Sequence, residues 1–291
     1  MRRLENCGIQ TTDLTGLIFK PLRGEFQLSR NDLDVNYLLV TALAEKEMGV
    51  VSDLRTKGIE VNVLPSTHTV YFENNYSENQ DHRTQKVFQK ADPFTAEQLL
   101  PTDARIFHLG PLLADDIPVE LIRTLSGKGI VSLDVQGYLR EVRNENVCAI
   151  DWPGKREALQ YVDILKANEY EMEVLTGQTN VRTGAIHLCD WGVKEVIITL
   201  GSKGSVIYNG EKFFDIPAYV PASLVDGTGC GDTYMAGYLF KRSKSAGMQE
   251  AGEFAAAMAT KNIESSGPFT GTEEDVLTLL GEGREKVFIL E

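Results

Sequence analysis

The stretch from residue 225 to residue 238 reads VDGTGCGDTYMAGY, with three glycines and two carboxylates directly before a helical pattern over residues 232–245. Glycines at positions 227, 229 and 231 let the backbone approach a ligand closely. The first N–H groups of the following helix have no partner within it. They therefore favour an anion through hydrogen bonds and through the helix dipole. The segment predicts an anion-binding site at the start of this helix.

Asp232, the carboxylate at the start of that helix, has two interpretations. An aspartate is common there because it interacts favourably with the dipole. However, three glycines in five residues carry a large entropic cost for a simple turn. A carboxylate beside an anion site is suited to removing a proton from a hydroxyl that attacks phosphorus. We therefore predict that Asp232 is a base, and that the N–H groups of Gly229, Cys230 and Gly231 stabilise the charge on a transferred phosphoryl group.

The composition excludes several other classes of protein. A chain of 291 residues can bury a substantial core, and 42% hydrophobic and 24% charged residues are ordinary for a globular protein. A net charge of −13 argues against nucleic acid or an anionic membrane as a partner. The four cysteines are widely spaced and indicate neither a zinc site nor a disulfide framework. With no apolar run long enough to span a membrane, the sequence predicts a cytoplasmic protein.

From about residue 36 onward, short β-branched runs alternate with helical patterns, which predicts a mostly parallel sheet with helices on both faces, within one domain over residues 1–291. The strands are predicted at 37–43, 59–64, 69–73, 105–109, 130–135, 162–166, 195–200, 205–208 and 212–216. The helices are predicted at 44–57, 118–127, 169–176, 182–191, 232–245, 249–265 and 273–281. The two strands around Pro65 and the polar run after them predict an antiparallel excursion over residues 59–90. A solvated surface loop is the alternative for this region.

A second motif, Asn168 followed by Glu171, comes directly after an apolar strand. Residues three apart share a helix face, and this pair is also close to a capping box. A third motif, Thr199-Leu200-Gly201 with Gly204, lies between two strands. It reads either as a hairpin turn or as a ligand-binding loop at the carboxyl end of a strand.

Together the three motifs resemble those of the ribokinase-like (PfkB) carbohydrate kinases. That signature reads Asp-Thr-x-Gly-Ala-Gly-Asp, from which this chain departs at Gly227 and Cys230, both small residues. The order and spacing of the motifs at 168, 199 and 226 also match the family. The resemblance implies a three-layer α/β/α fold with a small β lid, formed here by the excursion at 59–90, which often serves as a contact in homodimers.

The resemblance also implies the cofactors. ATP is the expected donor, flanked by Thr199, Gly201 and Gly204. Mg²⁺ is expected beside the phosphates, held through water by Asn168 and Glu171, which is consistent with the oxygen ligands that this cation prefers. A K⁺-like cation is expected near Asp226 and Thr228.

The acceptor site is the part where the sequence matches the family least. Family members open with an apolar strand ending in an aspartate that binds the sugar, and then a Gly-Gly-x-x-x-Asn motif. Asp13 is the counterpart of that aspartate in a poor version of the strand, and the atypical segment 1–35 contains no Gly-Gly pair. Farther on, Gln136 and Arg140 follow the end of a strand, where such residues either reach a ligand or cap and pair locally.

The sequence therefore predicts an ATP-dependent kinase that phosphorylates a hydroxyl of a small sugar or polyol. Cyclitol and nucleoside kinases of the same superfamily remain alternatives, because nothing in the residues separates these acceptors. A further alternative is a nucleotide-binding regulatory protein that keeps the phosphate site and has lost the acceptor site.

Overall fold

The computed structural model describes residues 17–20, 36–76, 83–282 and 285–286. Its centre is a nine-stranded sheet in which every strand except β1 and β12 runs in the same direction. The order is β13 (Phe213–Ile216), β12 (Ser205–Tyr208), β11 (Glu195–Thr199), β10 (Ile164–Asn168), β7 (Ile130–Asp134), β6 (Ile106–Leu109), β1 (Leu17–Lys20), β2 (Asn36–Leu43) and β3 (Glu60–Pro65).

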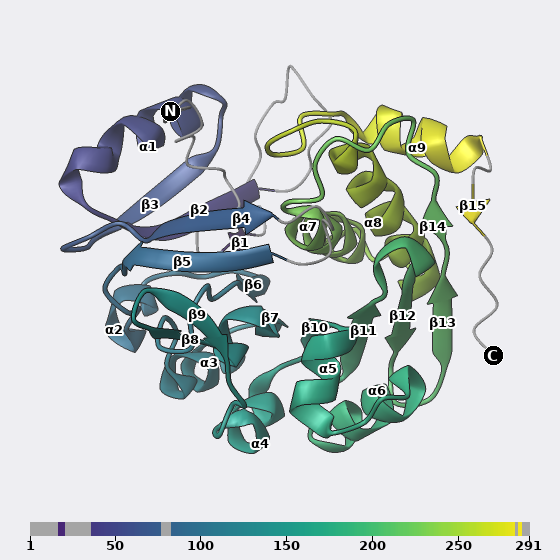
Figure 1. Cartoon of the computed structure of the whole chain (residues 1–291), viewed down its shortest axis with the longest axis horizontal. Helices are drawn as coiled ribbons and strands as arrows, with labels where there is room; N and C mark the ends of the chain where they lie inside the picture. Colours follow the sequence, from purple (N-terminus) through teal and green to yellow (C-terminus); the bar gives the residue numbers. More distant parts are fainter. Residues whose placement is uncertain (1–16, 21–35, 77–82, 283–284, 287–291) are drawn as a thin grey trace.

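Helices cover both faces of this sheet (Figure 1), so the predicted α/β fold is confirmed. One layer contains α2 (Ala96–Leu99), α3 (Val119–Ser126), α4 (Lys155–Ala158), α5 (Glu169–Thr176) and α6 (Val181–Asp190). The other contains α1 (Met48–Thr56), α7 (Cys230–Ser243), α8 (Met248–Ile263) and α9 (Glu273–Gly281). In Figure 1, α5 and α6 lie below the strands β10–β12, and α7 and α8 lie above them.

The period of two along each strand explains the layers, because successive side chains point to opposite faces. In β11, Val196 and Ile198 pack in the core that contains α3–α6, and Ile197 packs in the core that contains α7–α9. All three side chains are fully buried. A strand buried on both faces needs a continuous apolar run, which is the pattern that β11 shows.

Small residues bring α7 and α8 close to each other and to the sheet. A Cβ atom at Gly237 of α7 would lie 3.1 Å from the Cα of Ala255 in α8. A Cβ atom at Gly252 of α8 would lie 2.6 Å from Cδ1 of Ile216 and 2.9 Å from Cδ1 of Ile207. The glycines therefore set how near α8 can approach its neighbours.

A second sheet contains β4 (Tyr71–Tyr76), β5 (Arg83–Gln89), β9 (Asn146–Ala149) and β8 (Arg140–Arg143), in that order. The predicted antiparallel pairing around Pro65 is wrong. β3 runs parallel to β2 in the central sheet, and β4 pairs instead with β5, beyond the polar run. The alternation that predicts a strand does not reveal its partner, because pairing depends on segments far apart in the chain.

The remaining differences from the sequence prediction are at strands with weak patterns, at helix ends and at the one-turn helices α2 and α4, which were not predicted. β5, β8 and β9, which were not predicted, belong to the small sheet and carry many polar residues. β1 and the short pair β14 (Ala218–Tyr219) and β15 (Glu285–Lys286) were not predicted either. Helix α7 begins at Cys230, two positions before the predicted start.

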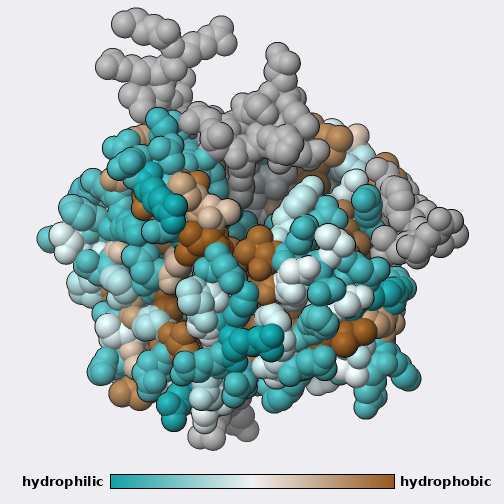
Figure 2. All heavy atoms as spheres, turned by 60° about the horizontal axis from the view of Figure 1, so that its bottom comes forward, coloured by the Kyte–Doolittle hydropathy of each residue, from teal (hydrophilic) through white to brown (hydrophobic). Residues whose placement is uncertain are grey.

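The described surface is largely hydrophilic on the face seen in Figure 2, with hydrophobic residues gathered in separate patches. Among the described helices, none has the length and apolar character that a membrane crossing requires.

The packing of α8 generates a stability prediction. We expect Gly252→Ala to lower the free energy of unfolding by about 1–3 kcal/mol, because the added methyl group has no space against Ile216 and Ile207. Gly49→Ala in α1 is the matched control, since a Cβ atom there meets nothing within 4 Å. This control should raise stability by roughly 0.5–1 kcal/mol through helix propensity. Urea unfolding of both variants measures the difference, and equal effects would contradict the packing argument.

Candidate active site

The candidate site lies where the central strands end. Asp134 is the last residue of β7, Asn168 of β10 and Thr199 of β11. The parallel register places Asp134 beside Lys166, and Asn168 beside Thr199. The carboxyl ends of parallel strands in an open sheet are a common place for ligands. Two of the three sequence motifs are thus neighbours at one edge of the sheet.

Asn168 and Glu171 form a capping box at the start of α5. The backbone N–H of Asn168 donates to Oε2 of Glu171, and the backbone N–H of Glu171 donates to Oδ1 of Asn168, both at 2.8 Å. The Nε2 of Gln136 lies 3.4 Å from Oε1 of Glu171. The Asn168 and Glu171 pattern in the sequence therefore forms the capping box that its spacing indicated. It also fixes the carboxylate of Glu171, a residue that is 9% exposed, in one orientation.

The three glycines of the loop before α7 have different reasons to be glycine. Gly229 is the N-cap and has φ of 77°, in the left-handed region that favours glycine. Gly227 has open space around its missing side chain. Gly231 lies in the first turn of α7, and a Cβ atom there would be 3.0 Å from Nζ of Lys166. Only Gly229 is required by its own backbone conformation.

Asp226 closes the beginning of this loop. Its Oδ1 accepts a hydrogen bond from the N–H of Thr228 at 2.9 Å, and its Oδ2 accepts one from Oγ of Ser266 at 3.2 Å. Burial opposes ionisation, but these hydrogen bonds outweigh it and hold the Asp226 pKa below its usual value. The Nδ2 of Asn262 donates to the carbonyl of Thr228 at 3.3 Å, which joins the loop to α8.

Cys230, where the family signature has alanine, begins α7. Its backbone N–H, one of the three predicted anion donors, donates to the carbonyl of Gly227 at 3.4 Å. In the structure this N–H therefore has an acceptor within the loop, and its role as an anion donor stays a prediction. Burial raises the pKa of the Cys230 thiol, which lies 3.8 Å from the carbonyl oxygen of Ala259.

A buried ion pair lies beneath the first turn of α7. Nζ of Lys166 is 2.8 Å from Oδ2 of Asp134, and the two side chains are 6% and 8% exposed. Burial alone would lower the Lys166 pKa, but the carboxylates of Asp134, Glu171 and Asp232 raise it above its usual value. Burial would likewise raise the pKa of Asp134, and the Lys166 ammonium outweighs it and lowers that pKa. Lys166 therefore lies close to the first turn of α7 while its ammonium is held by Asp134.

Sequence reasoning missed this pair. The available signal was a lysine within the apolar strand Ile164-Leu165-Lys166-Ala167, since a buried lysine needs a charged partner. The partner lies 32 positions away, at the end of another strand.

His108 of β6 extends this polar cluster along the same face of the sheet. Its Nδ1 lies 3.0 Å from Oγ of Ser132. Burial is the main cause that lowers the His108 pKa, to about 4, so the ring is neutral at pH 7. It adds no positive charge beside Lys166.

The other described residues predicted to bind the nucleotide or the acceptor lie on β11, in the turn after it, and on β8. Oγ1 of Thr199 lies 3.5 Å from the carbonyl oxygen of Ala167. Gly201 in the turn η5 (Gly201–Lys203) and Gly204 directly after it have φ of 58° and 93°. The motif therefore forms the β11–β12 hairpin turn, which was one of its two interpretations, and its contact with a nucleotide stays a prediction. Arg140 begins β8 of the small sheet. Asp13 lies outside the described residues, and its role stays a prediction.

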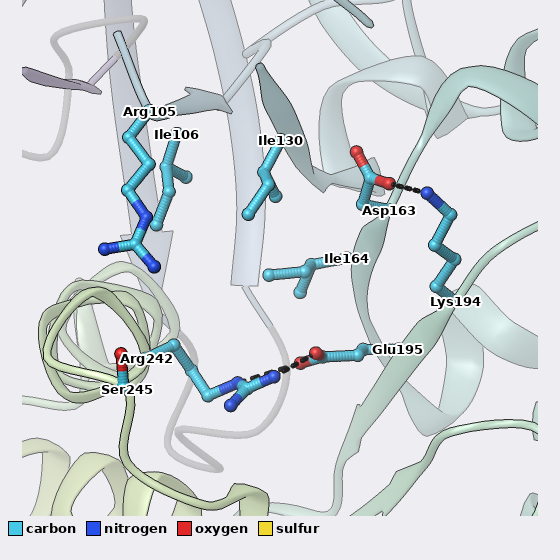
Figure 3. A pocket seen from close by; sticks show the side chains of 9 residues that line it. All are labelled: Arg105, Ile106, Ile130, Asp163, Ile164, Lys194, Glu195, Arg242 and Ser245. Carbon is cyan, nitrogen blue, oxygen red and sulfur yellow. Dashed lines mark hydrogen bonds and ion pairs between the residues drawn. The ribbon is translucent and has the colours of Figure 1, made fainter.

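A cavity of about 380 Å³ lies at the opposite edge of the sheet, by the amino ends of β6, β7, β10 and β11 (Figure 3). Four of its charged residues form two ion pairs, and Arg105 donates to the carbonyl of Ser243 at 3.0 Å. Lys194 contacts Asp163, and Arg242 contacts Glu195. These ion pairs attach α7 and neighbouring strands to one another, far from the glycine loop. The cavity is not part of the candidate active site.

The sequence pattern of the pfkB family carbohydrate kinases matches residues 52–275. The chain belongs to this family. The predicted resemblance is therefore confirmed over most of the chain, including all three motifs.

Individual relatives are similar over shorter stretches. A cytidine kinase of Thermococcus kodakarensis is 32% identical over 152 residues, 51% of this chain and 51% of the relative. A ribokinase of Arabidopsis thaliana is 32% identical over 177 residues, 58% of this chain and 44% of the relative. The chain thus spans about half the length of the curated relatives it matches.

Solved structures are similar over more of the chain. A pyrophosphate-dependent kinase in the ribokinase family, in a sulfate complex, has a TM-score of 0.75 and 30% identity, over 82% of this chain and 85% of its own. A structure of a pyrophosphate-dependent kinase in the ribokinase family, complexed with a pyrophosphate analog and myo-inositol, has a TM-score of 0.74. Arabidopsis thaliana ribokinase complexed with ribose and ATP, at 24% identity and a TM-score of 0.69 over 85% of this chain and 83% of its own, shows the shared fold.

The neutral His108 generates a prediction about pH. Its pKa is lowered on folding, so the unfolded chain binds more protons than the folded one below about pH 6.5, and stability falls with acidification. Between pH 7 and pH 5, His108 should account for a loss of about 2 kcal/mol. His108→Gln should remove this part of the pH dependence. Urea unfolding of both proteins at the two pH values tests it, and parallel pH dependences would contradict it.

Proposed function

We propose that the protein transfers a phosphoryl group to a hydroxyl of a small sugar or polyol. The observation that carries this proposal is the position of Asp232. It lies in the first turn of α7, directly after the glycine loop. It is also close enough to Lys166 for its charge to raise the pKa of that lysine. A base and an anion site are thus adjacent, as phosphoryl transfer to an alcohol requires.

In this reaction the acceptor oxygen forms a bond to the terminal phosphorus of the donor while Asp232 accepts the hydroxyl proton. The bond from that phosphorus to the bridging oxygen breaks, and the electron pair leaves with ADP, or with inorganic phosphate where pyrophosphate is the donor. The N–H groups of Gly229 and Gly231 are at the start of α7, where a helix leaves its donors unpaired, and they bind the oxygens of the transferred group. The Cys230 N–H joins them when a ligand competes with its 3.4 Å bond to Gly227. The helix is anchored along its length, so these groups need little rearrangement.

The residues fit Mg²⁺ held through water rather than by a protein cage. Among the residues that the structure describes, no group of three or more His, Cys, Asp or Glu side chains could hold a metal. The Glu171 carboxylate already serves the capping box through Oε2, which leaves Oε1 toward Gln136. Such a site is typical of Mg²⁺ bound mainly by donor phosphates and water. When bound, the ion neutralises charge on the phosphates.

A K⁺-like cation fits the loop that begins at Asp226. Oδ1 of Asn262 is buried and has no hydrogen-bond partner within the described part of the chain, although Nδ2 of the same amide donates to Thr228. This unpaired buried oxygen belongs to an amide that contacts the loop beginning at Asp226, and it supports a cation here because buried polar atoms are normally satisfied.

ATP is the proposed donor, and pyrophosphate is the second candidate. ATP is the molecule bound in the Arabidopsis ribokinase complex. Pyrophosphate is supported by the 30% identity to a pyrophosphate-dependent kinase over 82% of this chain. Sugars, cyclitols and nucleosides are all acceptors consistent with the relatives, whose names include ribokinase and cytidine kinase.

The small sheet β4-β5-β9-β8 is the proposed lid over the acceptor. Tyr71 and Phe88 lie on it with ring centroids 5.7 Å apart, and each is 42% exposed. This exposed aromatic pair supports the lid as a contact with a second copy of the chain. Gln136, in the turn after β7, and Arg140, the first residue of β8, are proposed to contact the acceptor. Asp13 is proposed to bind the acceptor as well.

We expect Asp232→Asn to lower kcat by about a hundredfold or more, because the amide cannot accept the hydroxyl proton. The measurement is acceptor-dependent phosphoryl transfer at saturating donor. Asp103→Asn is the control, since that side chain is 95% exposed, and it should leave kcat unchanged. Near-normal turnover of Asp232→Asn would refute the assigned role.

The donor and acceptor can be identified together. Phosphorus NMR of wild-type protein with ATP or pyrophosphate, Mg²⁺ and K⁺ should show a new phosphomonoester with one class among hexoses, pentoses, inositols and nucleosides. ADP as the second product identifies an ATP-dependent kinase, and inorganic phosphate identifies a pyrophosphate-dependent one. Donor binding without transfer to any acceptor would favour the regulatory alternative.

A further inference from the structure

Lys166 is a buried cation on the face of the central sheet that carries α7. It pairs in register with Ile197, whose side chain packs in the core formed by α7–α9. Its side chain is 6% exposed, and its ammonium is held 2.8 Å from the Asp134 carboxylate. The end of this side chain therefore has one fixed position beneath the first turn of α7.

Negatively charged groups outnumber positively charged ones around Lys166. Three carboxylates, those of Asp134, Glu171 and Asp232, act on its ammonium. His108, on the same face, is neutral at pH 7 because burial lowers its pKa to about 4. Without the lysine, these groups would present only negative charge to the glycine loop. A phosphate would then be repelled from the site.

Gly231 lies where the ammonium of Lys166 comes closest to the first turn of α7. This residue has a helical backbone, so its conformation does not require glycine. A side chain would instead meet Nζ of Lys166, 3.0 Å from the Cβ position, and Nζ cannot move away without leaving Asp134. The missing side chain therefore brings the ammonium next to a residue whose N–H belongs to the anion site.

We propose that Lys166 is a positioning residue that supplies the fixed positive charge of the anion site. Asp134 holds its ammonium against the first turn of α7, and this charge adds to that of the helix N-terminus in binding the phosphate chain of the donor. The inference rests on the proposed function, and it extends that function to a residue outside the three sequence motifs. The competing explanation is an ion pair that only supports the fold.

Two variants that break the same ion pair distinguish these explanations. Lys166→Met removes positive charge from the site, and Asp134→Asn removes negative charge. If the pair only supports the fold, both changes should affect anion binding in the same direction. If Lys166 supplies the charge, Lys166→Met should weaken anion binding, and Asp134→Asn should not, because the amide oxygen of the asparagine can still accept a hydrogen bond from Lys166.

The experiment is calorimetric titration of the full chain with pyrophosphate, and separately with ADP. We expect Lys166→Met to raise the dissociation constant for pyrophosphate by tenfold or more. Asp134→Asn should leave it within twofold of the wild type or lower it. Lys128→Met is the matched control for the loss of one positive charge. Its ammonium donates to the carbonyl of Thr102 at 2.8 Å and lies 3.7 Å from Asp103, and binding should stay within twofold.

Folding is controlled with a double variant. Lys166→Met leaves Asp134 buried without its partner, which can unfold the protein. Asp134→Asn combined with Lys166→Met replaces the ion pair by two neutral side chains. It should bind pyrophosphate at least tenfold more weakly than Asp134→Asn alone.

Some results would overturn the role of Lys166 alone, and another would overturn the proposed function as well. Equal weakening by Lys166→Met and Asp134→Asn, wild-type affinity in the folded Lys166→Met variant, or recovery of affinity in the double variant overturns the inference and leaves the proposed function intact. A wild-type protein that binds neither pyrophosphate nor ADP overturns both.

Discussion

The ion pair between Asp134 and Lys166 connects the parts of the candidate site. Asp134 ends β7, and its Oδ1 also accepts the N–H of Gln136 at 3.1 Å, which starts the turn that reaches Glu171. Lys166 precedes the capping box on β10 and approaches Gly231 in α7. Two charges can be buried only when their geometry is well satisfied. Their pairing therefore fixes how β7 and β10 meet at this point, and it holds Nζ of Lys166 next to the first turn of α7.

Helix α7 carries Asp232 and is held to the sheet at several points along its length. At its beginning, Gly231 packs against Lys166. In its middle, Tyr234 OH lies 2.7 Å from Oγ of Ser205 in β12, and Tyr238 OH donates to Glu195 of β11 at 2.7 Å. Near its end, Arg242 pairs with the same glutamate. A base on so firmly attached a helix is preorganised, because little conformational freedom is left to lose when a substrate binds.

The three glycines before α7 show why a motif has to be interpreted position by position. Gly229 is needed for its left-handed backbone, and Gly231 for the space that Lys166 occupies. Gly227 has neither constraint, which agrees with a larger residue being usual there in the family signature. The same run of glycines thus reflects one local requirement, one tertiary requirement and one position with open space.

The sequence by itself determined the features that depend on neighbouring residues. The capping box of Asn168 and Glu171, the ends of α5 and α9, and the buried strand β11 all follow from short-range signals, and the three motifs together identified the family. Tertiary structure decided the pairing of β4 with β5 rather than β3, and the partner of Lys166. The physical reason is that strand register and buried charge pairing join residues far apart in the chain, whereas caps, turns and periodicity involve residues only a few positions apart.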